Sequence, residues 1–493
     1  MYDFIIIGAG YGGLTAASLL ARSNKKVLIL ESHYSIGGCA GFYKREGLLY
    51  DVGATTLSGF DYGGPLDRIE KTLNFKLKKK RIDPGMVICF KGKRILRYRN
   101  FDKWINELNR HFPGINHEKI WSRIEKVSED AWGMLSEVPL FPPAGFKDLF
   151  SFVNKNIGNY LKLFPGLLIS FKKSLPSDAR DHEDYISFLD QILMITAQEK
   201  SDNVPYLLAA LGLNYPKDTF YSYGGMTSMA HEIEKKMKEY QGELKKRRKV
   251  YSIEKTELGT FRVEAKFNKQ IEVYESKNIV SSIPIWSFSK ICSGSFKYKM
   301  DKVSKKYNKS WGAMTYYFSV KFVDELDSLY YQVHSDELKK FIDSESLFFS
   351  FSERDDQSRS KNGFQVVTVS THISIELFKK HNFYQDDKEK IKKFETIVLS
   401  SFKEHFNKFK ILEIGKGEVG TPATFEKYTS RFEGRVGGVP HILDYYPFSY
   451  PKNVTPDPNI FLAGDTVFPG QGVVGVISGA FSLVHRILKN EES

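Results

Sequence analysis

Four residues near the amino terminus have the types and spacing of a dinucleotide-binding turn. Gly8, Gly10 and Gly13 follow the pattern G-x-G-x-x-G, and Glu31 comes 18 residues after Gly13. The first glycine permits a tight turn, the second lets the backbone approach a pyrophosphate, and the third lets a helix pack close to a strand. A carboxylate at position 31 can accept hydrogen bonds from ribose hydroxyls. We predict that these four residues bind a dinucleotide cofactor.

The surrounding sequence contains the elements that would position this turn. Residues 4–7 form a short apolar run, as expected of a strand buried on both faces of a parallel sheet. Residues 14–22 are rich in Ala and Leu and are expected to form the helix whose N-terminus faces the phosphates. Residues 27–30 are predicted to be the second strand, and the carboxylate follows it directly. Strand, turn, helix, strand and carboxylate thus occur in the order of a dinucleotide-binding fold.

A second glycine pair favours FAD over NAD as the cofactor. Gly37 and Gly38 follow the ribose carboxylate within a few positions. Many FAD oxidases and desaturases carry such a pair where the chain passes close to a bulky cofactor, whereas simple NAD dehydrogenases generally do not. An ordinary loop is the alternative interpretation of these two glycines.

The carboxyl-terminal end repeats the pattern of strand, turn and helix. Residues 459–463 are predicted to be a strand that runs into Gly464 and Asp465, and a small-residue helix begins at Gly472 and Val473. We expect Asp465 to hydrogen-bond ribityl hydroxyls or to lie near the pyrophosphate. The N-terminus of the helix would face the pyrimidine side of the flavin, where its partial positive charge stabilises the anion of the reduced form. Two such corners at opposite ends of the chain imply an FAD-binding domain that is discontinuous in sequence.

The segments 8–13, 37–55 and 464–472 resemble the phytoene desaturase and carotenoid isomerase family of flavoproteins. The residues around 223–250 and 421–440 fit the same family in shorter patches. The resemblance implies that the backbone of Val250 meets the adenine, and that the substrate is a long apolar polyene such as a carotenoid. Desaturation, cis–trans isomerisation and saturation all stay open, as do the carotenoid, the electron acceptor and the oligomeric state.

The predicted fold class is α/β, with a Rossmann-like FAD-binding lobe, an inserted α+β substrate lobe and an amine-oxidase/phytoene-desaturase-like architecture. We expect the discontinuous FAD-binding domain to combine residues 1–75, 205–290 and 410–493. The substrate and membrane-facing domain would combine residues 76–204 and 291–409. Residues 271–286 are predicted to include a strand that returns to the FAD sheet.

Two other functions are weighed against a carotenoid-acting enzyme. One is a flavin amine-oxidase or protoporphyrinogen-oxidase-like enzyme, which would share the glycine turn and the Gly-Asp corner. Residues 468–472 fit the carotenoid branch better. The other, from a different class, is a Rab GDP-dissociation-inhibitor-like protein that binds lipid without flavin. Glu31 together with Asp465 argues against it, because a flavin-free chain has no need of both cofactor corners.

The net charge of +13 over 493 residues limits the partners. No nucleic-acid module is legible, so the basic residues are interpreted as solvated or as attracting anionic lipid. Residues 138–175 interleave aromatic and aliphatic side chains with lysines, which fits either a membrane-interface element or ordinary core helices. No stretch approaches the ~18 apolar residues of a membrane span. No leader pattern precedes the first strand. We therefore expect a cytoplasmic protein that associates peripherally with a membrane.

The cysteines and histidines indicate no further chemistry. Cys39, Cys89 and Cys292 are far apart and form no CxxC pair, which argues against a disulfide framework and against a metal site. Covalent flavin attachment in related amine oxidases uses a cysteine near the carboxyl-terminal FAD motif, and none of the three lies there in sequence. The FAD is therefore expected to be non-covalent. The eleven histidines show no catalytic or metal-binding spacing, so no catalytic acid or base is predicted.

Overall fold

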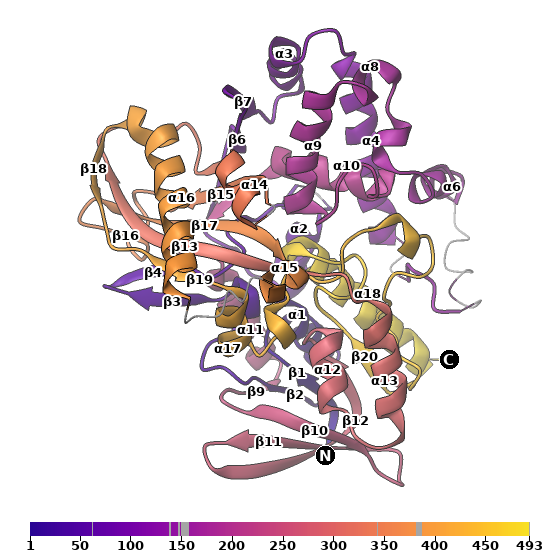
Figure 1. Ribbon diagram of the computed structural model, residues 1–493. Helices are drawn as coiled ribbons and strands as arrows, with labels where there is room; N and C mark the ends of the chain where they lie inside the picture. Colours follow the sequence, from indigo (N-terminus) through magenta and orange to yellow (C-terminus); the bar gives the residue numbers. More distant parts are fainter. Residues whose placement is uncertain are drawn as a thin grey trace.

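The structure is a computed structural model that describes residues 1–61, 63–137, 140–145, 148, 157–342, 344–380 and 387–492. Two sheets organise these residues, and segments from both ends of the chain meet in the lower one in the view of Figure 1. The predicted strand at the amino terminus is the centre of that sheet, because β1 (Tyr2–Ile7) lies between two parallel neighbours.

The first sheet has seven strands in the order β10-β11-β12-β1-β2-β9, with β20 also paired to β12. Their bounds are β2 (Val27–Leu30), β9 (Glu243–Lys245), β10 (Lys249–Lys255), β11 (Phe261–Phe267), β12 (Gln270–Ser281) and β20 (Ile460–Leu462). The long β12 pairs with β11 through its first half and with β20 through its second half. The predicted strand that returns to this sheet is therefore present, and it ends before α12 (Ile285–Ile291).

Helices from both ends of the chain pack together on the first sheet. α1 (Tyr11–Arg22) is buried along nearly its whole length and contacts α18 (Gly472–Glu492) and α11 (Thr227–Glu239). By length and composition α18 could span a bilayer, which differs from our expectation for this chain. However, 72% of its apolar window is buried inside the protein. That burial is typical of a core helix, and it follows from the packing against α1.

The second sheet has nine strands in the order β18-β13-β17-β15-β14-β6-β7, with β16 paired to β17 and β19 paired to β13. Their bounds are β6 (Met86–Phe90), β7 (Lys93–Arg97), β13 (Trp311–Phe322), β14 (Tyr330–His334), β15 (Ser346–Phe351), β16 (Ser360–Lys361), β17 (Phe364–Ser374), β18 (Ile411–Ile414) and β19 (Glu418–Gly420). Most of its pairings are antiparallel, which is the α+β character expected of a substrate lobe.

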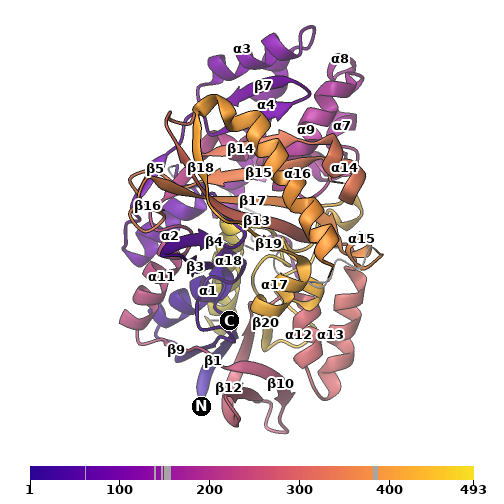
Figure 2. The same cartoon turned by 60° about the vertical axis from the view of Figure 1, so that its left-hand side comes forward.

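Helices cover the second sheet and lie beside it. α16 (Lys388–Phe406) crosses one face, as Figure 2 shows, and its phenylalanines pack against the aromatic residues of β13 and β15. A helical layer lies at the top of Figure 1 and comprises α3 (Phe101–His111), α4 (His117–Glu137), α9 (Glu183–Thr196) and α10 (Tyr206–Asn214). α10 contacts both α4 and α9, which fixes this layer as one packed unit.

Shorter elements complete the described chain. The helices are α2 (Pro65–Leu73), α6 (Ile157–Leu163), α7 (Phe171–Ser174), α8 (Ser177–Arg180), α13 (Ser295–Lys306), α14 (Asp336–Ile342), α15 (Ile375–Lys380) and α17 (Pro422–Thr429). Two small antiparallel sheets pair β3 (Phe42–Arg45) with β4 (Leu48–Asp51) as a hairpin, and β5 (Lys79–Arg81) with the distant β8 (Phe220–Ser222).

Two stretches at the edges of the expected FAD-binding domain contact the other structural unit. β18 and β19, within residues 410–493, pair with β13 of the second sheet. α10, within residues 205–290, packs on the helical layer above that sheet. α10 also shares a hydrophobic core with Ile5 and Ile7 of β1. Both stretches lie within about ten residues of the expected limits at 205 and 410, so they bear only on where the domain boundaries fall. The assignment of the remaining residues to two domains stays a prediction.

Candidate functional site

The amino-terminal glycine turn joins β1 to α1 in the predicted way. Gly8 has a φ of +95°, a conformation that favours glycine. A Cβ added at Gly13 would lie 2.2 Å from the carbonyl oxygen of Gly8, so only glycine lets α1 start this close to the strand. A Cβ at Gly10 would meet only Ser282 Oγ, at 3.8 Å. Gly10 therefore presents open backbone beside the N-terminus of α1.

Glu31 stands at the end of β2 with its carboxylate turned toward the glycine turn. It accepts hydrogen bonds from the backbone N–H groups of Ala9 and His33, each at 2.7 Å, and from Ser32 Oγ at 3.2 Å. Burial raises the pKa of this carboxyl above its usual value, while the hydrogen bonds act in the opposite direction. The carboxylate is thus held in place before any ligand reaches it.

Gly37 and Gly38 pass directly beside the same turn. Their φ values are +104° and +59°, and the N–H of Gly37 donates to the carbonyl oxygen of Ala9 at 2.9 Å. A β-bridge links Gly10 to Gly37. Gly37 is therefore hydrogen-bonded to the glycine turn, and contact of the pair with a cofactor stays a prediction.

The carboxyl-terminal corner touches the amino-terminal one. A Cβ added at Gly12 would lie 2.7 Å from the backbone nitrogen of Gly464, and Gly464 has a φ of +95°. Asp465 follows it and pairs with Arg431, with 2.6 Å between Nη2 and Oδ2. Gly472 has a φ of +76° and no atom within 4 Å of an added Cβ, and Val473 follows it in α18. The two corners thus form one site.

A single cavity of about 710 Å³ connects these elements. Of the predicted cofactor residues, those on its wall are Gly8, Gly10, Glu31, Gly37, Gly38, Val250, Gly464, Asp465, Gly472 and Val473. Gly13 lies behind the turn and does not line the cavity. The volume falls in the range of about 300–1,000 Å³ that is typical of small-molecule sites.

The other half of the cavity lies between the helical layer and the second sheet. Its wall carries apolar side chains, which are Ile195, Leu208 and Leu211 from the α9–α10 region and Ala313 and Phe348 from the sheet. Polar side chains stand among them, including Gln198, Thr315, Ser370 and His372. The cavity therefore joins a polar, glycine-rich half to a second half with apolar and polar side chains, which we call the apolar half for its Ile, Leu and Phe residues. A molecule held in the first half can meet an apolar molecule held in the second.

The polar half fits a dinucleotide. Ser282 Oγ and Gln471 Nε2 are buried on its wall and have no hydrogen-bond partner among the described residues. A buried polar atom without a partner is costly unless a ligand or water satisfies it. Gly10 and Gly472 leave space that a side chain would fill. The donors, the acidic groups and this free space agree with a bound dinucleotide.

Three functional candidates on the cavity wall were not predicted. Arg431 is buried and pairs with Asp465, and no local pattern around it signals this role. His372 on β17 and His441 both line the cavity, and burial lowers the pKa of each to about 4, so both are neutral at pH 7. His441 directly follows the segment 437–440 that carries the family resemblance, which is the one sequence signal that was available.

Cys39 lies closer to the carboxyl-terminal corner than its place in the sequence suggests. It lines the cavity and interacts with Arg431 and Asp465. Burial raises the pKa of its thiol, so the reactive thiolate is disfavoured. Cys89 and Cys292 are buried free cysteines away from this cavity. Among the described residues, no group of three His, Cys, Asp or Glu side chains could hold a metal ion.

Comparisons with known proteins found similarity at three levels: in the region of the glycine turn, in the sequence of the whole chain, and in the fold. Residues 6–73 match the model of the NAD(P)-binding Rossmann-like domain. Prolycopene isomerase from Daucus carota is 27% identical over 99% of this chain and 80% of its own length. All-trans-retinol 13,14-reductase from Danio rerio is 25% identical over 47% of this chain and 39% of its own length.

Two solved structures share the fold over nearly the whole chain. An oxidoreductase from Methanosarcina mazei has a TM-score of 0.65 at 16% identity, covering 98% of this chain and 99% of its own. Cyclohexylamine oxidase from Brevibacterium oxydans has a TM-score of 0.58 at 13% identity, covering 100% of both chains. The predicted fold class is therefore confirmed.

Proposed function

We propose that this protein binds FAD and isomerises a long apolar polyene. The chain is related to the carotenoid isomerase and desaturase flavoproteins, as its motifs indicated, and it is an oxidoreductase-type flavoenzyme. The observation that carries the proposal is a cavity whose glycine-rich, dinucleotide-type half opens directly into a half that offers Ile195, Leu208, Leu211 and Phe348 to an apolar molecule. The relatives that match over the full length have names of polyene isomerases, which favours isomerisation over desaturation or saturation.

The polar half would hold FAD through residues from both ends of the chain. The N-terminus of α1 and the open backbone at Gly10 would take the pyrophosphate, and Glu31 the ribose. The backbone near Val250 would meet the adenine. Asp465 and the start of α18 at Gly472 would face the flavin end. The cofactor stays non-covalent in this proposal, because burial raises the pKa of the nearest thiol, that of Cys39.

Bound FAD would supply electron-transfer chemistry. Such chemistry would let a double bond of the polyene lose part of its bond order, rotate, and then regain it. The protein's own residues would bind, orient and exclude water. His372 and His441 are neutral at pH 7 and therefore add no charge beside an uncharged substrate. Arg431 is the buried cation nearest to Asp465, and its ion pair holds that carboxylate at the cofactor end.

The alternatives receive less support. The solved amine oxidases match in fold alone, at 13–14% identity, and a shared fold does not transfer a substrate. A flavin-free lipid-binding protein would have no use for the buried, unpartnered groups Ser282 Oγ and Gln471 Nε2 in the polar half. Neither alternative would explain why the prolycopene isomerases are similar to this chain over 99% of its length.

We further propose that the protein lies on a membrane through an apolar patch, which consists of Leu161, Phe164, Leu168, Ile169 and Phe448. These side chains are exposed, Leu161 to 64%, and the rings of Phe164 and Phe448 pack together across 6.0 Å. The exposed Lys162 and Lys173 lie beside the patch in sequence, which suits anionic headgroups. The short helix at 164–167 packs on α10, whose Leu208 and Leu211 line the cavity.

The other large apolar side chains described in the stretch 138–175 are buried, unlike those of the patch. Leu140, Phe141, Tyr160, Leu163 and Phe171 are buried in the core, so for them the interpretation as core residues holds. Residues 138–139, 146–147 and 149–156 lie outside the described residues. We also propose that the protein resides in the cytoplasm, on the face of a membrane that supplies the polyene.

The test is anaerobic incubation of the purified flavin-loaded protein with a panel of polyenes, with the flavin first oxidised and then reduced. We expect geometric isomers with no added double bonds, and only when the flavin is reduced. A product absorbing at longer wavelength from the oxidised protein would replace isomerisation by desaturation. A protein that purifies without flavin absorbance would overturn the cofactor assignment, and a yellow protein inert toward every polyene would overturn the substrate class.

A further inference from the structure

Four hydroxyl-bearing side chains stand in one row across four strands of the second sheet. Tyr317 on β13 lies opposite Thr368 on β17, which lies opposite Ser350 on β15, which lies opposite Tyr330 on β14. Directly opposite residues of antiparallel strands point to the same face of a sheet. All four side chains are buried, with exposures of 6%, 1%, 3% and 1%. We call this set the hydroxyl row.

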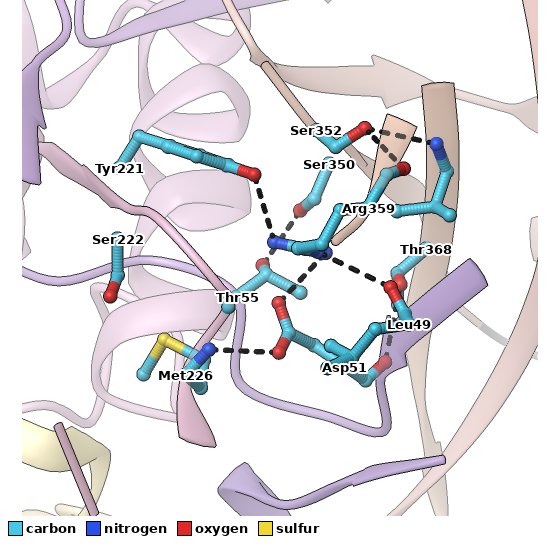
Figure 3. A network of polar contacts seen from close by, with 12 residues as sticks. Leu49, Asp51, Thr55, Tyr221, Ser222, Met226, Ser350, Ser352, Arg359 and Thr368 are labelled. Carbon is cyan, nitrogen blue, oxygen red and sulfur yellow. Dashed lines mark hydrogen bonds and ion pairs between the residues drawn. The ribbon is translucent and has the colours of Figure 1, made fainter. Parts of the chain in front are cut away.

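Each member of the hydroxyl row bonds to one short segment, residues 51–55. Tyr317 donates to the carbonyl oxygen of Val52 at 2.5 Å, and Thr368 donates to that of Asp51 at 3.2 Å. Tyr330 donates to the carbonyl oxygen of Thr55 at 3.2 Å. Ser350 Oγ and Thr55 Oγ1 are 2.7 Å apart, and Figure 3 shows the side chains of Ser350 and Thr368 turned toward this segment.

The hydroxyls of the two tyrosines remain donors over the physiological pH range. Burial raises the pKa of Tyr317 and that of Tyr330 well above the usual value for tyrosine. Neither phenol therefore ionises near neutral pH. A segment held by these four side chains is held by neutral hydrogen bonds, which do not depend on the salt concentration.

The start of the segment is fixed by a buried ion pair. Asp51 is fully buried, and its Oδ2 lies 2.9 Å from Nη2 of Arg359. Its other oxygen accepts from the backbone N–H of Met226 at 2.9 Å. Arg359 also donates to the carbonyl oxygen of Leu49. Figure 3 shows the contacts of Arg359 and Met226 meeting at the carboxylate of Asp51. The segment consequently cannot slide along the hydroxyl row.

The far side of the segment faces the polar half of the cavity. Residues 52–56 line the cavity wall. The N–H of Val52 donates to Gly41 and that of Ala54 to Cys39, at 3.1 and 3.3 Å. A Cβ on Gly53 would lie 2.7 Å from the carbonyl oxygen of Cys39. The chain 37–41 in turn bonds to the amino-terminal glycine turn. The hydroxyl row thus connects the second sheet to the dinucleotide corner through two backbone segments, 51–55 and 37–41.

The next row of the same sheet lines the cavity itself. Thr315, Ser370 and Phe348 are two residues further along their strands and lie on its wall. Two residues of a strand span about 6.8 Å. One set of strands therefore carries a row against the apolar half of the cavity and a row against the cofactor-facing segment.

We propose that Tyr317, Thr368, Ser350 and Tyr330 are positioning residues, which set the distance between the cofactor and the substrate by docking residues 51–55 on the substrate-side sheet. The part of this inference that concerns flavin rests on the proposed function. The row touches neither cofactor nor substrate and acts through the backbone of the segment. Loss of one hydroxyl should loosen the segment and disturb the flavin site while the sheet stays intact.

The chain offers matched control variants one residue away. Tyr316 is next to Tyr317 on β13, faces the opposite side of the sheet, and donates to Glu395 at 2.9 Å. Tyr331 is next to Tyr330 on β14 and accepts a bond from the N–H of Ser328 at 3.3 Å. Tyr316→Phe and Tyr331→Phe therefore remove an equivalent hydroxyl from the same strands, but on the face packed against α16.

The experiment compares Tyr317→Phe and Tyr330→Phe with these controls by amide hydrogen exchange of the peptide 49–57. Flavin affinity and the visible spectrum of bound flavin are measured in parallel. We expect faster exchange at 52–54, a shifted flavin spectrum and about three- to tenfold weaker flavin binding in the row variants only. A lowered kcat at unchanged KM should accompany these changes, because the cofactor is displaced while the substrate wall is intact.

Equal behaviour of Tyr317→Phe and Tyr316→Phe in exchange and flavin affinity would overturn the proposal. If the wild-type protein retains no flavin, the proposed function fails, and the exchange of residues 52–54 still decides whether the row positions the segment. Ser350→Ala, which removes a smaller contact, provides the same readouts if a tyrosine variant does not fold.

Discussion

Arg431 and Asp465 form a buried ion pair on the cavity wall, with 2.6 Å between Nη2 and Oδ2. Arg431 is 9% exposed, and its Nε also donates to the carbonyl oxygen of Arg435. A carboxylate at a cofactor corner needs a compensating charge when it is removed from water. The pair therefore keeps the carboxylate of Asp465 oriented at the point where the two glycine corners meet.

Replacing Arg431 with Met should leave that carboxylate buried without its partner. We expect the free energy of unfolding to fall by about 3–5 kcal/mol, together with loss of flavin from the purified protein. Chemical denaturation and flavin absorbance measure the two effects. The control is Arg262→Met, which breaks the exposed pair with Glu264 and should change stability by at most about 1 kcal/mol. Similar losses in both variants would contradict this role of the pair.

Glu31→Ala should weaken flavin binding by about 1–3 kcal/mol, through loss of charged hydrogen bonds. Fluorescence titration with FAD measures the effect, and Glu254→Ala, an exposed glutamate on β10, is the control. Burial raises the pKa of Glu31, so its carboxyl protonates at a higher pH than an ordinary glutamate. Flavin affinity of the wild type should therefore fall on acidification, and that part of the pH dependence should be absent from the variant. Unchanged affinity in Glu31→Ala would place the ribose elsewhere.

The part of the site that could be predicted from sequence is the part that local spacing encodes. Gly8, Gly13 and Glu31 lie within one strand–turn–helix–strand unit, and a single pattern specifies its backbone. The corner at Gly464 repeats this logic. Their meeting in one cavity was inferred from chemistry, since one dinucleotide needs both ends held. Their roles toward FAD stay a prediction.

The remainder depends on contacts between segments far apart in sequence. The hydroxyl row exists only through the register of four strands, and no residue spacing reveals that Tyr317 and Tyr330 face the same segment. Arg431 acquires its role from a partner 34 positions away. For the same reason the sequence does not show that α10 contacts the helical layer as well as sharing a core with Ile5 and Ile7 of β1.

Gly13→Ala should separate α1 from the strand that precedes it. The added Cβ would lie 2.2 Å from the carbonyl oxygen of Gly8 and 2.9 Å from Ser282 Cβ, so backbone must shift. We expect a loss of about 1–3 kcal/mol in stability from overpacking, together with weaker flavin binding. Gly133→Ala is a control with the opposite sign, because Gly133 is exposed in α4 with nothing within 4 Å of its Cβ. That variant should gain about 0.5–1 kcal/mol. A stability gain in both variants would refute the close approach at Gly13.

Acid should destabilise the protein through His441. Burial lowers the pKa of this imidazole to about 4, whereas in the unfolded chain it titrates near the usual value of about 6.5. The unfolded state then binds the proton first, so stability is lost as the pH falls from about 6.5 to about 4, by up to about 3 kcal/mol. The free energy of unfolding should depend less on pH in His441→Gln than in the wild type over this interval. His231→Gln, at an exposed histidine of α11, should keep the wild-type slope. Parallel curves for all three proteins would mean that His441 is protonated in the folded state.

The apolar patch should determine membrane binding. Leu161, Leu168 and Phe448 are 64%, 54% and 50% exposed, and burying such a side chain in a bilayer interface is favourable by up to about 1.5–3 kcal/mol. Replacing all three with Ser should therefore lower the partitioning into anionic vesicles by about tenfold or more in a sedimentation assay. The control replaces Leu258 and Leu412, which are 91% and 62% exposed and lie outside the patch, and it should sediment like the wild type. Because the patch packs on α10 beside the cavity, the triple variant should also isomerise polyene from vesicles more slowly, while its rate with detergent-dispersed polyene is preserved. Wild-type sedimentation of the triple variant would exclude the patch as the membrane contact.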